Sequence, residues 1–169
     1  MNKDKDCICL IGMPGSGKST IGKQLSEKLN YTFFDTDEEI EKREKTKIKD
    51  IFSIKGEDYF RSIETLAFNE LIEKKKVVIS TGGGIILNNL EKLNLTFNIY
   101  LYCGIDVLIQ RASRNNLRPL LSKNTPLQMT NLFNERKDIY IKVADITINA
   151  TDNQNVTITE ILKKIKNDN

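Results

Sequence analysis

The fold of this chain is decided by the stretch Gly12-Met13-Pro14-Gly15-Ser16-Gly17-Lys18-Ser19, which Thr20 follows. It matches the phosphate-binding loop pattern G-x-x-x-x-G-K-[ST], with an apolar run before it and an amphipathic run after it. Gly15 and Gly17 permit a tight curl, so that backbone N–H groups and the positive end of the next helix face one anion. A glycine-rich turn that binds nothing is the alternative, but it has no need of Lys18-Ser19. The stretch therefore predicts an ATP site formed by Gly15, Ser16, Gly17, Lys18, Ser19 and Thr20.

Two loop side chains and two carboxylates indicate the chemistry. Lys18 would reach the β- and γ-phosphates, and the Ser19 hydroxyl would ligate Mg²⁺. The predicted strand 31–34 ends in Asp35-Thr36-Asp37, where carboxylates point into the ligand crevice of α/β proteins. One carboxylate can hold waters of Mg²⁺, and the other can accept a proton or hydrogen bond from a substrate hydroxyl. The alternative is that Asp35 or Asp37 caps the charged helix 38–45.

Length and composition exclude several classes of protein. The 169 residues are 39% hydrophobic and 29% charged, with a net charge of +3 spread along the chain, so we expect one domain over residues 1–169 and no nucleic-acid partner. Apolar runs are too short for a membrane span, and no apolar stripe suggests more than a monomer. Cys7, Cys9 and Cys103 lie in apolar runs and predict buried thiols in a cytoplasmic protein.

Apolar and amphipathic runs alternate along the chain. Strands are predicted at 7–11, 31–34, 77–80, 97–102 and 146–148, and helices at 18–29, 38–45, 48–54, 57–73, 106–114 and 127–142. A capping box, Thr157-x-x-Glu160, predicts the start of the last helix. This order predicts a three-layer α/β fold of the phosphate-loop kinase type with a five-stranded parallel sheet. Two insertions, at about 37–62 and 115–125, are interpreted as a substrate-binding region and a mobile lid.

Three features indicate either an interaction with an oppositely charged group or the close approach of another group to the backbone. Arg61 begins a helix, where a cation is unfavourable unless an acidic partner or ligand lies nearby, although a solvated arginine is the alternative. Arg136 lies on the packed face of its helix and requires an anion, either an internal carboxylate or a bound one. Gly82-Gly83-Gly84 ends a strand and indicates either close approach to the backbone or a flexible turn.

The ordered set of motifs resembles the shikimate kinase family over most of the chain. The set comprises G-M-P-G-S-G-K-S-T, F-F-D-T-D-E-E-I-E, G-E-D-Y-F-R-S-I-E, T-G-G-G, and R-P-L-L followed by E-R-K-D-I-Y. The resemblance implies transfer of the ATP γ-phosphoryl group to the 3-hydroxyl of shikimate. The family's R-x-P-L-Y reads here Arg136-Lys137-Asp138-Ile139-Tyr140, without the proline, so we expect an uninterrupted helix.

The resemblance also implies roles for single residues. Asp37 would bind the substrate hydroxyls and assist deprotonation, while Arg61 and Arg136 would hold the shikimate carboxylate. The glycine run Gly82, Gly83 and Gly84 would line the substrate, with the Gly83 N–H as a donor. Asp35 would hold Mg²⁺ through water, beside Ser19 as direct ligand. The remaining ATP contacts would be the lid residue Arg118, which would meet the transferring phosphoryl group, and two adenine contacts, Arg111 and either Gln154 or Asn153.

Two other functions use the same phosphate loop. A kinase for another small acid, such as gluconate, would keep the loop but would not explain the set Asp37, Arg61 and Arg136. A non-catalytic nucleotide-binding module would have no use for Lys18 and Ser19 together with the Asp35 and Asp37 carboxylates.

Overall fold

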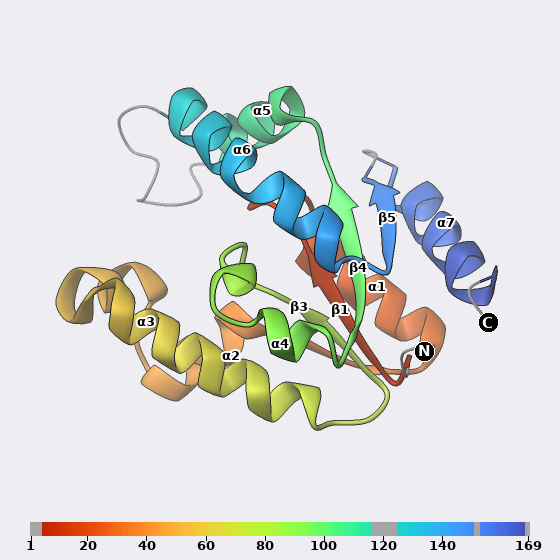
Figure 1. The fold of residues 1–169 in the computed structure, drawn as a ribbon, viewed down its shortest axis with the longest axis horizontal. Coiled ribbons are helices and arrows are strands. Elements are labelled where there is room, and N and C mark those ends of the chain that lie inside the picture. The colour runs from red at the N-terminus through yellow and green to blue at the C-terminus, as the bar shows by residue number, and fades with distance from the viewer. Residues whose placement is uncertain (1–4, 116–124, 151–152, 168–169) are drawn as a thin grey trace.

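The computed structural model describes residues 5–115, 125–150 and 153–167. Its centre is a five-stranded parallel sheet in the order β2-β3-β1-β4-β5 (Figure 1). The strands are β1 (Cys7–Ile11), β2 (Thr32–Asp35), β3 (Val77–Ser80), β4 (Phe97–Tyr102) and β5 (Ile146–Asn149). The predicted α/β class and parallel sheet are therefore confirmed. The central strand β1 is buried over its whole length, because helices cover both faces of the sheet.

The helices form two outer layers. They are α1 (Lys18–Leu29), α2 (Thr36–Glu44), α3 (Ile48–Ile72), α4 (Leu90–Leu93), α5 (Ile105–Asn115), α6 (Thr125–Val143) and α7 (Gln154–Asn167), with a 3-10 turn η1 (Ile85–Leu87). Alternate residues of β1 face opposite layers: Cys7, Cys9 and Ile11 share a core with α3 and α6, whereas Ile8 and Leu10 share one with α1 and α7. The three cysteines are buried thiols, as predicted.

Helix α2 packs against residues 51–67 of α3 in a third apolar core at one end of the molecule (Figure 1), whereas Phe68 and Leu71 of α3 belong to the core shared with β1. Gly56 interrupts the helical geometry of α3 with a φ of 82°, which is a conformation that favours glycine. Across the kink, the Glu44 carboxylate accepts hydrogen bonds from Lys55 Nζ at 3.0 Å and from Tyr59 Oη at 2.9 Å. The two predicted helices 48–54 and 57–73 correspond to the two parts of α3.

The start of the last helix was predicted wrongly. Helix α7 begins at Gln154, so Thr157 lies inside it and is fully buried. Asn153 takes the capping role, since its Oδ1 accepts a hydrogen bond from the Val156 N–H at 3.3 Å. The Thr157 hydroxyl instead donates to the Asn153 carbonyl at 3.3 Å.

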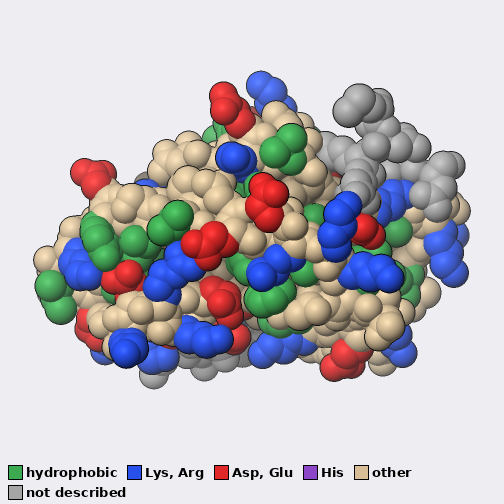
Figure 2. All heavy atoms as spheres, turned by 90° about the horizontal axis from the view of Figure 1, so that it is seen from below, with side chains coloured by type: hydrophobic (Ala, Val, Ile, Leu, Met, Phe, Trp, Pro, Cys, Tyr) green, Lys and Arg blue, Asp and Glu red, His purple; other side chains and the backbone are tan. Residues whose placement is uncertain are grey.

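Most of the predicted lid, 115–125, including Arg118, lies outside the described residues. The surface view in Figure 2 shows cationic and anionic side chains interspersed on one face, without a concentrated basic patch there. None of the helices in the described ranges is long and apolar enough to cross a membrane.

Candidate active site

The phosphate loop joins β1 to α1 with the conformations that its glycines were predicted to supply. Gly15 and Gly17 have φ values of 84° and 94°. Lys18 is almost buried, with 8% of its surface exposed, and its ammonium donates to the carbonyls of Gly12 and Met13, both at 2.9 Å. The lysine thus lies inside the curl of the loop, with its charge held where a phosphate would meet the loop.

A cluster of oxygen atoms lies beside the loop where β2 and β3 end. The Ser19 hydroxyl donates to Asp35 Oδ2 at 2.6 Å and lies 3.2 Å from the Ser80 hydroxyl. Asp35 also caps α2, because its Oδ1 accepts from the N–H groups of Asp37 and Glu38 at 3.0 and 3.4 Å. The predicted helix-capping role of Asp35 is therefore confirmed for one oxygen, while its other oxygen accepts from Ser19 of the loop. Hydroxyl and carboxylate oxygens are ligands that Mg²⁺ prefers.

Ser80 was not singled out from the sequence. It ends the apolar strand β3, and parallel pairing sets it beside Asp35 of β2. A polar residue that closes an apolar strand next to the glycine run is the signal that could have found it.

Arg61 has a buried internal partner. Its Nη1 donates to Glu64 Oε2 at 2.7 Å, and its Nη2 donates to Glu57 at 3.1 Å. Glu64 is only 1% exposed. Burial raises the pKa of the Glu64 carboxyl above its ordinary value, although the neighbouring Arg61 acts in the opposite direction. Arg61, a cation that is unfavourable near the start of a helix, is therefore stabilised by the carboxylate of Glu64, one turn further along the helix.

Glu64 is the main site residue that the sequence analysis missed. It lies on the same stripe of α3 as the buried Phe60, Ile63 and Ala67, where an acid requires a partner. Its spacing of three residues from Arg61 is the signal that could have identified it.

The glycine run is needed because side chains crowd its backbone. A methyl group added to Gly82 would lie 2.7 Å from Glu64 Oε1 and 3.0 Å from Asp37 Oδ1. One added to Gly83 would lie 2.8 Å from Pro14 Cδ in the phosphate loop, and one added to Gly84 would overlap the Arg61 guanidinium. The predicted close approach is therefore confirmed, and the run separates the phosphate loop from the cluster of Asp37, Glu64 and Arg61.

Backbone groups of the run have partners on α2 and α6. The Gly82 N–H donates to the hydroxyl of the buried Thr36 at 2.9 Å, so Gly82 contributes space rather than a donor. The Gly83 carbonyl accepts from Arg136 Nη1 at 2.9 Å and also from the Tyr140 hydroxyl. Arg136 is 9% exposed, as its position on the packed face of α6 predicted. Its Nε has no hydrogen-bond partner within the described ranges.

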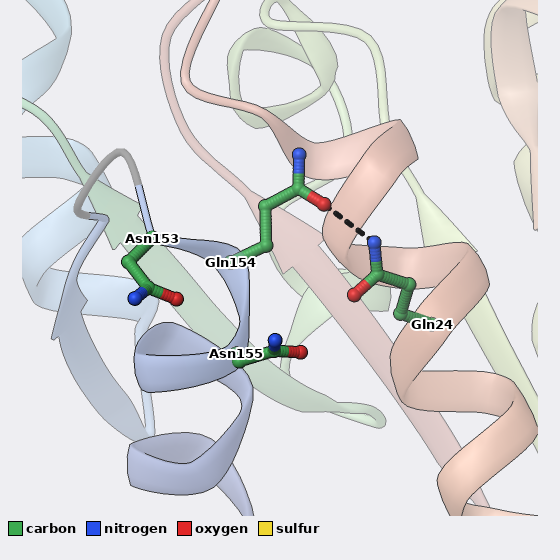
Figure 3. Close-up of a pocket in the computed structure, with 4 residues that line it drawn as sticks. All are labelled: Gln24, Asn153, Gln154 and Asn155. Atoms are coloured by element: carbon green, nitrogen blue, oxygen red, sulfur yellow. Dashed lines mark hydrogen bonds between the residues drawn. The ribbon is translucent and has the colours of Figure 1, made fainter.

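The two predicted adenine contacts lie against different segments, Arg111 against the phosphate loop and Gln154 against α1. Arg111 of α5 donates from Nη1 to the Gly15 carbonyl at 3.2 Å. Gln154, at the start of α7, accepts a hydrogen bond from Gln24 of α1 (Figure 3). Gln24 and Gln154 border a recess together with Asn153 and Asn155. All four side chains offer carboxamide donors and acceptors.

Comparison with known proteins identifies the family. A family model described as Shikimate kinase matches residues 14–166. This chain belongs to the shikimate kinase family. It is 39% identical to Shikimate kinase 1 of Salmonella newport (strain SL254) over 160 residues, which cover 92% of each chain. Its activity is therefore shikimate kinase activity, in the shikimate pathway of aromatic amino acid biosynthesis.

Solved shikimate kinases share the fold. The enzyme from Acinetobacter baumannii, in complex with shikimate, superposes with a TM-score of 0.91 at 36% identity, covering 98% of this chain and 95% of the other. The enzyme from Aquifex aeolicus vf5 gives a TM-score of 0.81 at 40% identity, covering 95% and 96% of the two chains. The predicted family and phosphate-loop kinase fold are thus confirmed.

Proposed function

We propose that this chain transfers the γ-phosphoryl group of Mg-ATP to the 3-hydroxyl of shikimate between the phosphate loop and the glycine run. One observation carries the assignment: the glycine run contacts Pro14 of the loop, the cluster of Asp37, Glu64 and Arg61, and also Arg136. Such contact brings a site for an acid next to a site for phosphate. A kinase needs this adjacency, because phosphoryl transfer depends mainly on positioning and charge stabilisation.

The acid would bind through its carboxylate to Arg61, Arg136 and the glycine run, which together form the acid site. Arg61 and Arg136 both reach the glycine run, and a planar guanidinium matches a carboxylate with two parallel hydrogen bonds. The Arg136 Nε is buried and makes no hydrogen bond among the described residues, and its ion-pair partner Glu135 Oε1 lies 3.9 Å away. It is a donor that a bound carboxylate would satisfy. The Gly83 N–H is a further donor, and the absence of side chains at Gly82 and Gly84 leaves space for the substrate.

Asp37 would then face the reacting hydroxyl. Its Oδ1 lies beside Gly82, at the boundary between the acid site and the loop. There it would accept a hydrogen bond from shikimate and orient the 3-hydroxyl toward the γ-phosphate, receiving the proton as the bond to phosphorus forms.

The nucleotide would be held by the loop. Lys18 would turn its ammonium from the loop carbonyls onto the β- and γ-phosphates, and Gly15, Ser16, Gly17 and Thr20 would offer the surrounding donors. Ser19 would bind Mg²⁺ directly and Asp35 through water, a role that suits their oxygen cluster. When bound, Mg²⁺ neutralises charge on the β- and γ-phosphates. Arg111 and Gln154 would contact the adenine.

The predicted lid would complete the site. Residues 115–125 would close over the nucleotide and place Arg118 on the transferring phosphoryl group, while residues 37–62 bind shikimate within one domain. Closure keeps water from competing with the 3-hydroxyl. A monomeric state and a cytoplasmic location complete the proposal.

Release of ADP from Mg-ATP tests the proposal, with shikimate, quinate, gluconate and no acceptor compared in parallel. We expect turnover with shikimate to exceed that with each alternative by at least about 100-fold, because an alternative acid held by its carboxylate would place its hydroxyls differently relative to the γ-phosphate. Phosphorus and proton NMR of the product identify the hydroxyl that is modified. Equal turnover with gluconate, or phosphate on another hydroxyl, would contradict the assignment.

A further inference from the structure

The motif E-R-K-D-I-Y contains a tyrosine that the proposed mechanism does not use. Tyr140 is fully buried one turn after Arg136 on α6, and its hydroxyl donates to the Gly83 carbonyl. Arg136 donates to the same carbonyl at 2.9 Å. A carbonyl has two lone pairs, so these two donors fill its capacity and fix the direction in which the peptide between Gly83 and Gly84 points.

The Tyr140 ring is itself held by the core. It stacks on Tyr100 of β4, with ring centroids 5.1 Å apart and planes 21° from parallel. Tyr100 in turn lies near the start of the phosphate loop, since a methyl group added to Gly12 would be 3.5 Å from its Cε2. Burial raises the pKa of the Tyr140 hydroxyl, so it remains a donor at every pH at which the protein works.

We infer that Tyr140 is a positioning residue for the acid site: its hydroxyl fixes the Gly83 carbonyl, so the glycine run keeps its place between the phosphate loop and the two arginines. The reasoning rests on the proposed binding of shikimate to Arg136 and Gly83. In a trans peptide the N–H points away from the C=O. The hydrogen bond from Tyr140 to the Gly83 carbonyl therefore directs the Gly84 N–H away from α6. Because of this bond, Arg136 is one of two donors to the Gly83 carbonyl instead of its only donor.

The positioning role predicts a selective kinetic effect. Tyr140→Phe keeps the ring and its stacking on Tyr100 but removes the donor, leaving the Gly83 carbonyl with Arg136 only. Loss of one buried hydrogen bond corresponds to about a 5- to 10-fold change. We therefore expect the KM for shikimate to rise about 5- to 10-fold, while the KM for ATP stays within about twofold of the original value.

Tyr100→Phe is the matched control. It removes a hydroxyl from the other ring of the same stacked pair, but the Tyr100 hydroxyl has no hydrogen-bond partner in the described part of the chain. We expect both KM values to stay unchanged in this variant. The melting temperature of each variant is measured first, and the kinetics are recorded well below it.

Arg136→Ala, assayed in parallel, separates the inference from the function on which it rests. If Arg136→Ala raises the KM for shikimate but Tyr140→Phe changes only the melting temperature, Tyr140 is purely structural and the inference fails. It also fails if Tyr140→Phe raises both KM values alike, or if Tyr100→Phe has the same effect. If Arg136→Ala leaves the KM for shikimate unchanged, the proposed acid site itself is wrong.

Discussion

Gly84→Ala tests the packing of the acid site most sharply. Gly84 has φ −98° and ψ 0°, which alanine can adopt, so the backbone itself resists the change little. The added methyl group would instead overlap the Arg61 guanidinium, whose Cζ would be 2.8 Å away. Arg61 would have to move, and its movement would break the 2.7 Å bond to Glu64.

The size of the effect follows from burial. The Arg61 side chain is 16% exposed and the Glu64 side chain 1% exposed, so neither charge can regain full hydration when the pair separates. A hydrogen bond between charged groups contributes about 1.5–3 kcal/mol. A displaced Arg61 would also lose its place on the shikimate carboxylate. We therefore expect kcat/KM for shikimate to fall roughly 10- to 100-fold.

The assay is coupled ADP release at saturating Mg-ATP with shikimate varied, followed by the KM for ATP at saturating shikimate. Gly104→Ala is the matched control, because in the described part of the chain no atom other than those of its chain neighbours lies within 4 Å of the added methyl group. The KM for ATP should change little in both variants. If folded Gly84→Ala keeps the kcat/KM of the control within about twofold, the reasoning about the Arg61 position is refuted.

Three further predictions follow from the same site. Arg136→Ala should raise the KM for shikimate on the order of 100-fold with little change in that for ATP, and steady-state kinetics showing the reverse pattern would exclude Arg136 from the acid site. Because the pKa of Glu64 is raised above its ordinary 4.5, the folded state retains a proton that the unfolded chain releases. The original protein should therefore gain most stability over Glu64→Gln below pH 4.5. This difference in the free energy of unfolding should decrease as pH rises through the raised pKa, by at most about 1.4 kcal/mol per pH unit. Urea titrations in which the difference increases with pH would contradict this sign. Ser19→Ala should raise the half-saturating Mg²⁺ concentration by about tenfold or more, and an unchanged Mg²⁺ dependence of turnover would remove Ser19 from the metal site.

Most of the fold could be predicted because its strands are short and apolar throughout. β3 and β4 were predicted at their observed bounds. The start of α7 could not, because Asn153 and Thr157 are both good helix caps. Packing decides between them: α7 lies against α1 and β5, and burial of Thr157 extends the helix by one turn at its start.

The sequence predicted those site residues that a single motif identifies, but not those whose role depends on contacts between distant segments. Arg61, Arg136 and the glycine run each carry a local anomaly that signals an interaction. Glu64 carries the same kind of anomaly, but its meaning depends on Arg61, Asp37 and Gly82 meeting it in space. Ser80 carries a local signal as the polar end of an apolar strand, but its position beside Asp35 depends on strand pairing. The bond between Thr36 and the Gly82 N–H depends on the turn after β3, which no local pattern specifies.

In the proposed complex, two arginines at the glycine run bind the carboxylate of shikimate. This binding is measured by comparing kcat/KM for shikimate and for its methyl ester, in the original protein and in Arg136→Ala. Loss of the carboxylate charge should cost the original protein about 100-fold or more, and the ratio should shrink to about tenfold or less in the variant. The same ratio in both proteins would show that Arg136 does not bind the carboxylate and would contradict the account.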